Sequence, residues 1–344
     1  MEYVFHIIIM LNIYIMLTLS ANLTIGMANL LTMCQAAFYG IGAYIGTYFL
    51  MQFDLPLVVI AVLVILFTGV FSFLVSYASV RLKGDYFVIA TMGFQLIVYT
   101  ILYNWTDVTR GPYGILGIPG IKLFGLFELS GVYAYLVLSL VLMVIVVFLF
   151  HHLVESPFGR TLNAIRADET MVKAMGRNTV LLKSWAFFLS AAVAGLAGFI
   201  YASYVSYIDP TSFTLVESIF IISALFIGGI DNTKGPVLGA SFVVILPELL
   251  RLAVQDDDKF IYVQAFLLLC VAIHYFIAKF RGCFSSEKHL IQSELIVILV
   301  LELVHLWGPP ESIIANLRQI FYGLALILVM YYRPQGLWGK TVLN

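Results

Sequence analysis

The stretch ESPFGRTLNAIRADETMVKAMGRNTVLLKSW, residues 155–185, is the longest polar-rich segment of a chain that is otherwise strongly apolar. It carries five basic residues and three acids, namely Arg160, Arg166, Lys173, Arg177 and Lys183 against Glu155, Asp168 and Glu169. Its apolar residues recur at helical spacing on one side, at Phe158, Leu162, Ile165, Val172 and Met175. Because two long apolar runs flank it, this stretch predicts a short amphipathic helix that docks on another surface.

The apolar runs on both sides indicate the class of protein. Of 344 residues, 62% are hydrophobic and 11% are charged, whereas a soluble domain is about 45–50% apolar and about 25% charged. A membrane span needs about 20 mostly apolar residues, and candidate spans lie at 4–22, 27–50, 55–80, 87–103, 132–153, 185–205, 217–230, 236–252, 260–279, 294–307 and 317–332. We therefore expect an all-α, polytopic helical membrane protein with about 8–11 transmembrane helices in one domain, 1–344.

The distribution of Lys and Arg predicts the orientation of these spans. With 155–184 placed in the cytoplasm, the inner segments hold thirteen Lys and Arg residues and the outer segments hold five. Such an excess is typical of cytoplasmic loops, so we expect 155–184 and the C-terminus to be cytoplasmic. The N-terminus is expected outside if the run 27–50 crosses fully, and inside if that run is re-entrant.

The sequence carries no signal for nucleotide binding or catalysis. The nearest glycine and lysine cluster, 228–236, lacks the spacing of a phosphate-binding loop. No nucleophile has a nearby base, no His, Cys and acid set has metal-ligand spacing, and nothing indicates nucleic-acid binding. Few ionisable residues lie within the candidate spans, chiefly His6, His274, Glu302 and His305, with Glu248 near a span end. Their scarcity in mid-span argues against proton or sodium coupling.

Small residues are abundant and suggest close helix packing and helix breaks. Gly42 and Gly46 form a GxxxG motif, and 191–198 (AAVAGLAG) is a second small-residue face. Two segments, 24–46 and 227–239, are expected to contain helices broken at membrane depth, one in each half of the chain. We also expect Asp85 to cap the helix that starts at Tyr86.

Several motifs together resemble a known family. They are QAAFYGIGAY at 35–44, GDYFVIAT at 84–91, NWT and GPYGI at 104–115, SPFGRTLNAIR at 156–166, AMG at 174–176, the small-residue face at 191–198, the glycines at 228–236, and RPQGL at 333–337. In these motifs the chain resembles the permease subunit of branched-chain amino acid ABC transporters, over about 20–252 and 317–339. Residues 253–316 have no counterpart there and are expected to add a helical hairpin.

The resemblance implies an ABC importer permease fold in the bacterial plasma membrane. It also implies three kinds of partner besides lipid: a second related permease subunit, two cytoplasmic ATPase subunits that carry the ATP and Mg²⁺, and an extracytoplasmic binding protein. This chain would then bind no cofactor. The segment 155–184 would be the coupling loop, with candidate coupling residues Phe158, Gly159, Leu162, Ile165, Arg166, Asp168, Glu169, Met175 and Gly176. Candidates for the translocation pathway are Gln35, Gly40, Gly42, Asp85, Tyr86, Gly228, Gly229, Gly235 and Pro236.

The coupling segment departs from the usual importer motif EAA-x-x-x-G. Thr170 stands six residues before Gly176, and Glu169 is one place off. The resemblance therefore carries over to the segment rather than to its individual residues. Separately, four other interpretations remain open: a urea or amide permease of the same architecture, a self-contained carrier or channel, a membrane enzyme, or a structural scaffold.

Overall fold

The computed structural model of the chain describes residues 2–255, except residues 54, 81, 83, 124–126, 129, 130, 231 and 232. Its long elements are helices, and its four strands are two residues each. The elements in chain order are α1 (Glu2–Asn22), the π-helix Leu23–Met27, α2 (Gln35–Phe53), α3 (Leu57–Ser79), α4 (Asp85–Asn104), α5 (Thr106–Thr109), the 3-10 helix Gly111–Tyr113, β1 (Ile115–Leu116), β2 (Lys122–Leu123), β3 (Phe127–Glu128), α6 (Val132–Glu155), α7 (Pro157–Ala167), α8 (Glu169–Ala174), α9 (Thr179–Val205), β4 (Tyr207–Ile208), the 3-10 helix Pro210–Phe213, α10 (Leu215–Gly228) and α11 (Lys234–Gln255).

The helical membrane architecture predicted from the apolar runs is confirmed. Within the described residues, five helices are long and apolar enough to cross a membrane: Glu2–Met27, Leu57–Tyr77, Asp85–Asn104, Val132–Glu155 and Thr179–Val205. Helices suit the hydrocarbon region because they satisfy their backbone hydrogen bonds internally. The expected spans at 260–279, 294–307 and 317–332, and the expected hairpin beyond residue 255, lie outside the described residues.

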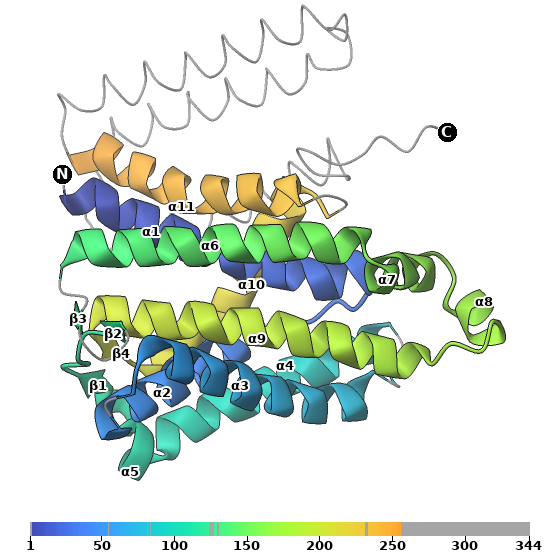
Figure 1. The fold of residues 1–344 in the computed structure, drawn as a ribbon, viewed down its shortest axis with the longest axis horizontal. Helices are drawn as coiled ribbons and strands as arrows, with labels where there is room; N and C mark the ends of the chain where they lie inside the picture. The colour runs from blue at the N-terminus through green and yellow to red at the C-terminus, as the bar shows by residue number, and fades with distance from the viewer. Residues whose placement is uncertain are drawn as a thin grey trace, which may run out of the picture.

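Helix α9 runs through the centre of the bundle (Figure 1). It packs against α2 and α3, and also against α1. A methyl group on Gly42 of α2 would lie 2.2 Å from the Cα of Gly195 in α9, so the two backbones touch. This contact confirms that the GxxxG motif and the small-residue face at 191–198 serve close helix packing.

The bundle has two ends, which we name by the elements found there. The α7 face is the end where α6 stops at Glu155 and α9 begins at Thr179; the β1 face is the opposite end (Figure 1). At the β1 face, β1 pairs antiparallel with β4, with Ile115 opposite Ile208. This pairing ties the segment that follows α4 and α5 to the residues just beyond the end of α9.

Helix α1 runs from the β1 face to the α7 face. Near its start, His6 Nδ1 lies 2.8 Å from the hydroxyl of Tyr204, close to the end of α9. Beyond its end, Gly26 contacts α7. The N-terminus and the segment 155–184 therefore lie at opposite ends, as expected if the run 27–50 crosses fully.

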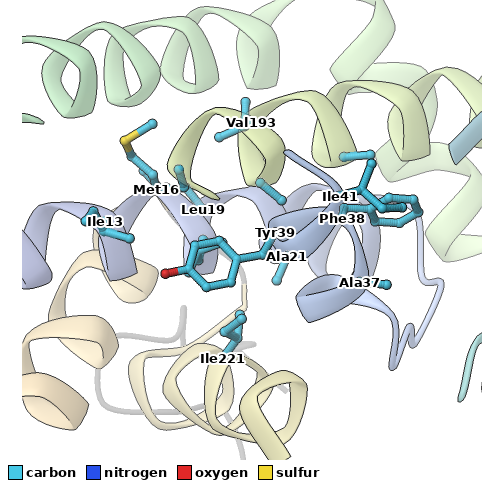
Figure 2. Packing of buried hydrophobic residues seen from close by; sticks show 14 of the residues in the cluster. Ile13, Met16, Leu19, Ala21, Ala37, Phe38, Tyr39, Ile41, Val193 and Ile221 are labelled. Atoms are coloured by element: carbon cyan, nitrogen blue, oxygen red, sulfur yellow. The ribbon is translucent and has the colours of Figure 1, made fainter. Parts of the chain in front are cut away.

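One apolar cluster joins the two halves of the chain. Figure 2 shows side chains of α1, α2, α9 and α10 meeting there, including Met16, Phe38, Val193 and Ile221. Because α1 and α2 come from the first half and α9 and α10 from the second, this cluster holds the halves together.

Candidate functional site

Two broken helices meet in the middle of the bundle. Both α2 and α10 begin there: the backbone N–H of Ala36 donates to Ser218 Oγ at 2.9 Å, and Ser218 Oγ donates to Gln95 Oε1 at 3.4 Å. Gln95 lies ten residues after Asp85 in a helix of 20 residues, which places it about 15 Å along α4. We call the residues Gln35, Ala36, Gln95, Phe213 and Ser218 the junction.

The break in the first half falls within the predicted segment 24–46. After the π-helix, residues 28–34 run without regular helix from the α7 face to the junction. The N–H of Met33 donates to Thr91 Oγ1 at 3.1 Å, and the side chain of Gln35 donates to the hydroxyls of Ser20 and Ser190. These bonds satisfy polar groups that would otherwise be stranded in the membrane interior.

The break in the second half was predicted at the wrong place. Gly228 is the last residue of α10, Gly229 follows it, and Gly235 and Gly239 lie in α11, where they let its backbone approach α10 closely. The turn between the two helices lies beside Gly26 at the α7 face. The segment that enters to mid-depth is 206–214, which leads from the end of α9 to the start of α10. Gln95 Nε2 holds it by donating to the carbonyl of Phe213 at 2.8 Å. Glycine-rich sequence is typical of tight turns as well as of broken membrane helices. The break in the second half of this chain instead contains Pro210 and the short 3-10 helix that begins there.

Glu217 is a residue that the sequence did not single out. As the first residue of the predicted span 217–230, it was expected at a membrane boundary. Because α10 starts at the junction, Glu217 instead lies at mid-depth, next to Ser218, where its Oε1 accepts a hydrogen bond from the Tyr14 hydroxyl at 2.5 Å. The Asp209-Pro210 dipeptide, seven residues earlier, favours a turn, and it is the sequence signal from which a helix start at mid-depth could have been predicted.

The predicted pathway residues are dispersed rather than gathered. Gln35 is buried at the junction, Gly40 packs against Phe213, and Gly42 packs against Gly195. Gly228 ends α10, Gly229 follows it, and Gly235 lies in the first turn of α11. The carbonyl of Pro236 accepts a hydrogen bond from Thr18 Oγ1 at 3.1 Å. Their part in a pathway stays a prediction.

Asp85 and Tyr86 lie at the α7 end of α4. The predicted cap is wrong: Gly84 occupies the N-cap position, without a side-chain cap, and Asp85 is the first helical residue. An acid at this place still favours the helix electrostatically. Asp85 lines a cavity of about 540 Å³ with Glu169, Lys173 and Lys183, whereas Tyr86 is 73% exposed.

The segment 155–184 forms two short helices instead of one. Ser156 Oγ caps α7 by accepting from the N–H of Gly159 at 3.2 Å. Asp168 ends α7 and caps α8, where Oδ1 accepts from the N–H groups of Thr170 and Met171 at 2.8 and 3.2 Å. Gly176 follows α8 with a φ of +79°, a conformation that favours glycine. Hydrogen bonds from the Thr170 side chain and from the two backbone N–H groups lower the pKa of Asp168.

The apolar stripe of this segment does not face outward. Leu162 is 0% exposed, Ile165 and Val172 are also buried, and Phe158 packs against the core from a half-buried position. The predicted docking of this stripe on another surface thus takes place within the chain itself, so Leu162 and Ile165 are not exposed to a partner. Met175 was placed on the same stripe but is 80% exposed, because the break at Asp168 ends the helical register. With Met171, at 68%, it forms the exposed apolar surface of α8.

An ion-pair cluster holds α8 against the start of α9. Glu169 lies 2.7 Å from Lys183 Nζ and 2.9 Å from Lys173 Nζ, and it accepts a hydrogen bond from Thr179 at 3.1 Å. Burial tends to raise the pKa of Glu169, but the hydrogen bonds of Lys183 and Lys173, the charge of Lys183 and the Thr179 hydroxyl outweigh it, so that the pKa falls from 4.5 to about 2. Glu169 is thus charged at neutral pH and fixes the position of α8.

Arg166 connects α7 with the broken part of the first half. Its Nη1 donates to the carbonyl oxygen of Gly26 at 2.9 Å. Gly26 belongs to the π-helix that precedes the extended segment leading to the junction. A displacement of α7 would therefore act directly on the backbone that leads to mid-depth.

The described part of the chain shows no metal centre. Among those residues, no group of three or more His, Cys, Asp and Glu side chains could hold a metal ion. The features that the structure does gather are the junction, the α7–α8 segment and the Arg166–Gly26 bond between them.

Comparison with known proteins identifies similar sequences. The sequence profile of a family described as "Branched-chain amino acid transport system / permease component" matches residues 3–273. The chain is 34% identical over 262 residues to the high-affinity branched-chain amino acid transport system permease protein LivM of Salmonella typhimurium, a region covering 70% of this chain and 61% of that protein. A probable LivM of Methanocaldococcus jannaschii is 32% identical over 197 residues, covering 56% of each chain.

A more distant relative has a different permease name. The probable branched-chain amino acid transport permease protein LivH of Methanocaldococcus jannaschii is 23% identical over 256 residues, covering 71% of this chain and 78% of that protein. The chain spans about three fifths of the length of the Salmonella relative, 61%. No solved structure shows significant similarity to the chain.

Proposed function

Because the chain belongs to the family of permease components of branched-chain amino acid transport systems, we propose that it is the membrane-spanning permease subunit of an ABC importer. Its substrates are branched-chain or related amino acids, and a separate ATPase drives their inward movement. The chain itself catalyses no reaction, and ATP and Mg²⁺ bind to partner chains. The protein resides in the bacterial plasma membrane, with 155–184 and the C-terminus in the cytoplasm.

The proposed assembly contains a second, related permease subunit, two cytoplasmic ATPase subunits and an extracytoplasmic binding protein. Similarity to relatives named LivM and LivH supports a pair of permeases. The ATPases would bind at the α7 face and the binding protein at the β1 face, since these are opposite ends of the bundle. Lipid surrounds the exposed apolar sides of the helices.

The observation that carries the proposal is the construction of the α7–α8 segment. It is fastened to the chain by its buried stripe and by the Glu169 ion pairs, and it exposes Met171 and Met175. The bond from Arg166 to Gly26 then links it to the backbone of the junction. A partner that pushed on α8 would transmit the displacement inward, as coupling between two conformational states requires.

The test is ATP-dependent uptake by the reconstituted assembly. The chain is expressed with its partner permease, ATPases and binding protein, and the complex is placed in liposomes with ATP inside. We expect accumulation of labelled leucine that requires ATP hydrolysis and is reduced by unlabelled valine but not by urea. Competition by urea instead of valine would assign the chain to the urea and amide permeases.

One observation favours a second candidate, a self-contained carrier. Glu217 places a carboxylate at mid-depth, and ion-driven carriers use such residues. Leucine uptake by the purified chain alone, driven by a proton or sodium gradient without any ATPase, would support this candidate and contradict the importer.

A further inference from the structure

An apolar groove of about 540 Å³ lies between α2, α3 and α4, three helices that pack side by side (Figure 1). None of the described residues that line it is charged. Its walls are aliphatic and aromatic side chains, chiefly Ile45, Phe49, Phe67, Phe94, Ile97 and Ile101. The groove therefore suits a ligand, or the part of a ligand, that is a hydrocarbon.

The groove opens on the side of the bundle that faces the lipid. Both α3 and α4 contain a stretch apolar enough to cross a membrane, and only 28% of each stretch is buried within the chain. Phe67 on α3 and Ile97 on α4, which line the groove, are also partly exposed on this membrane side. A ligand of the groove can thus enter from the bilayer without passing through water.

The length of the groove corresponds to one leaflet. Along α4 its lining begins at Phe94, next to Gln95 of the junction, and ends at Trp105, just beyond the helix. This distance is about 16 Å at the helical rise per residue, and half of the hydrocarbon core is about 15 Å thick. A transmembrane helix of a partner would need a contact surface over the full depth, so the groove fits an acyl chain better.

The outer end of the groove suits a phospholipid headgroup. Trp105 lines this end and is 52% exposed, and tryptophan is typical of the membrane interface. Thr109 also lines it, and the exposed Arg110 follows directly. Among the described residues, no carboxylate forms an ion pair with the Arg110 guanidinium. A basic residue at headgroup level attracts lipid phosphate.

From these features we infer that the groove binds one phospholipid of the leaflet at the β1 face. An acyl chain lies between α2, α3 and α4, and the phosphate contacts Arg110 beside Trp105. The inference goes beyond the proposed function, because it requires only that the chain spans a membrane.

The lipid would also brace the helices that carry the junction. Tyr44 lines the groove, and its ring lies 6.0 Å from that of Phe213 in the junction. A chain packed against Tyr44 therefore supports the position of α2 relative to the segment 206–214.

The experiment counts the lipids that the purified full chain retains in detergent, by native mass spectrometry. The delipidated chain is titrated with three ligands: dioleoyl phosphatidylglycerol; dioleoylglycerol, which lacks the phosphate; and glycerophosphoglycerol, which lacks the acyl chains. We expect one phosphatidylglycerol to bind saturably before any other, dioleoylglycerol to bind about fivefold more weakly, and glycerophosphoglycerol not to bind. A series of bound lipids without a saturable first step, or binding of glycerophosphoglycerol, would overturn the inference.

A variant that fills the groove locates the acyl chain. Ile45→Phe adds volume to the wall on α2, so it should weaken binding of the first phosphatidylglycerol about tenfold. Val144→Phe is the matched control, at an exposed position of α6, a helix that does not line the groove. Normal lipid binding by a folded Ile45→Phe chain contradicts the inference. If that variant retains the lipid but no longer copurifies with a second permease subunit, the groove is instead a contact between permeases.

A second variant tests the phosphate contact. Arg110→Gln should bind phosphatidylglycerol about fivefold more weakly, the usual worth of one basic residue at the membrane surface, and dioleoylglycerol as before. Arg160→Gln, at an exposed residue of α7 on the opposite face, is the control. An equal loss for both lipids in Arg110→Gln would contradict the phosphate contact.

Fluorescence keeps the inference testable if Ile45→Phe does not fold. One equivalent of phosphatidylglycerol with a brominated acyl chain is added to the delipidated chain in detergent. We expect it to quench Trp105, measured as the difference between the unsubstituted chain and Trp105→Phe. Absence of this quenching would place the lipid elsewhere and overturn the inference.

Discussion

Arg166 in α7 donates a hydrogen bond of 2.9 Å to the backbone carbonyl of Gly26, 140 residues earlier in the chain. Gly26 lies in a π-helix, a rare local geometry often found at functional sites. From there the backbone runs through residues 28–34 to the junction, where α2 and α10 begin. The bond is thus a direct mechanical connection between the surface segment 155–184 and the middle of the bundle.

Replacing Arg166 should uncouple transport without disassembling the complex. In Arg166→Gln, we expect ATP-driven leucine uptake by the reconstituted complex to fall about tenfold or more, the effect of losing one charge-assisted hydrogen bond. Binding of the ATPase, measured by copurification, should persist, because the buried stripe still holds α7. Arg160, exposed on the same helix, supplies the control Arg160→Gln. Normal uptake by Arg166→Gln would contradict a transmitting role.

The buried and exposed apolar residues of the coupling segment should respond differently to charge. Leu162→Asp places a carboxylate where no surface is exposed, so we expect a loss of several kcal/mol of stability and little folded protein. Met175→Asp should fold normally, since this side chain is 80% exposed, but weaken copurification of the ATPase. Thermal unfolding and copurification separate the two effects. Unchanged ATPase binding by Met175→Asp would rule out α8 as the docking surface.

The contact between α2 and α9 should not tolerate a side chain at Gly42. A methyl group there would lie 2.2 Å from the Cα of Gly195, so Gly42→Ala should destabilise the protein by about 1–3 kcal/mol. Gly93→Ala in α4 is the matched control, because nothing lies within 4 Å of its added methyl group. The midpoints of thermal unfolding in detergent give the comparison. Equal midpoints for the two variants would show that the backbones of α2 and α9 can separate at no cost.

The attachment of α8 should depend on the charge of Glu169. Its pKa is about 2 in the folded chain against 4.5 as the ordinary value. Because the folded pKa is the lower one, the carboxylate stabilises the fold fully above about pH 4.5 and loses this effect as the pH falls toward 2.

Glu169→Gln should therefore lower the protection of the α8 amides against hydrogen exchange at pH 7. Once the intrinsic pH dependence of exchange is corrected for, this protection should equal that of the unsubstituted chain in strong acid, where Glu169 is protonated. Glu155→Gln, at an exposed carboxylate, should leave α8 unchanged. Exchange in Glu169→Gln identical to that of the unsubstituted chain would mean that the buried stripe alone holds α8.

The junction should depend on the hydroxyl of Ser218. In Ser218→Ala, the buried N–H of Ala36 loses its acceptor, which should cost about 1–3 kcal/mol. Ser72→Ala is the control, since that hydroxyl bonds to Gly69 within its own helix. Unfolding in detergent measures both variants. A Ser218→Ala chain as stable as the control would mean that the start of α2 does not depend on α10.

The sequence alone determined the class of the protein and much of its packing. Long apolar runs predicted helices because the hydrocarbon region offers no hydrogen-bond partners to the backbone, and a helix satisfies its own backbone groups. The small residues at Gly42 and along 191–198 predicted close contact, because only such residues let backbones approach. The motifs in order also identified the family, which the match to residues 3–273 confirms.

Tertiary structure alone decided depth and exposure. The period of the coupling stripe marked an apolar side, but whether a partner or the chain itself covers Leu162 depends on how α7 folds back against the bundle. Likewise, Glu217 reads as a span boundary in sequence, yet lies at mid-depth because residues 206–214 enter the bundle before α10 begins. Local pattern reports which residues a helix contains and which side is apolar. The position of that helix along the membrane normal is set by contacts with segments far away in the chain, such as Ala36 and Gln95 with Ser218.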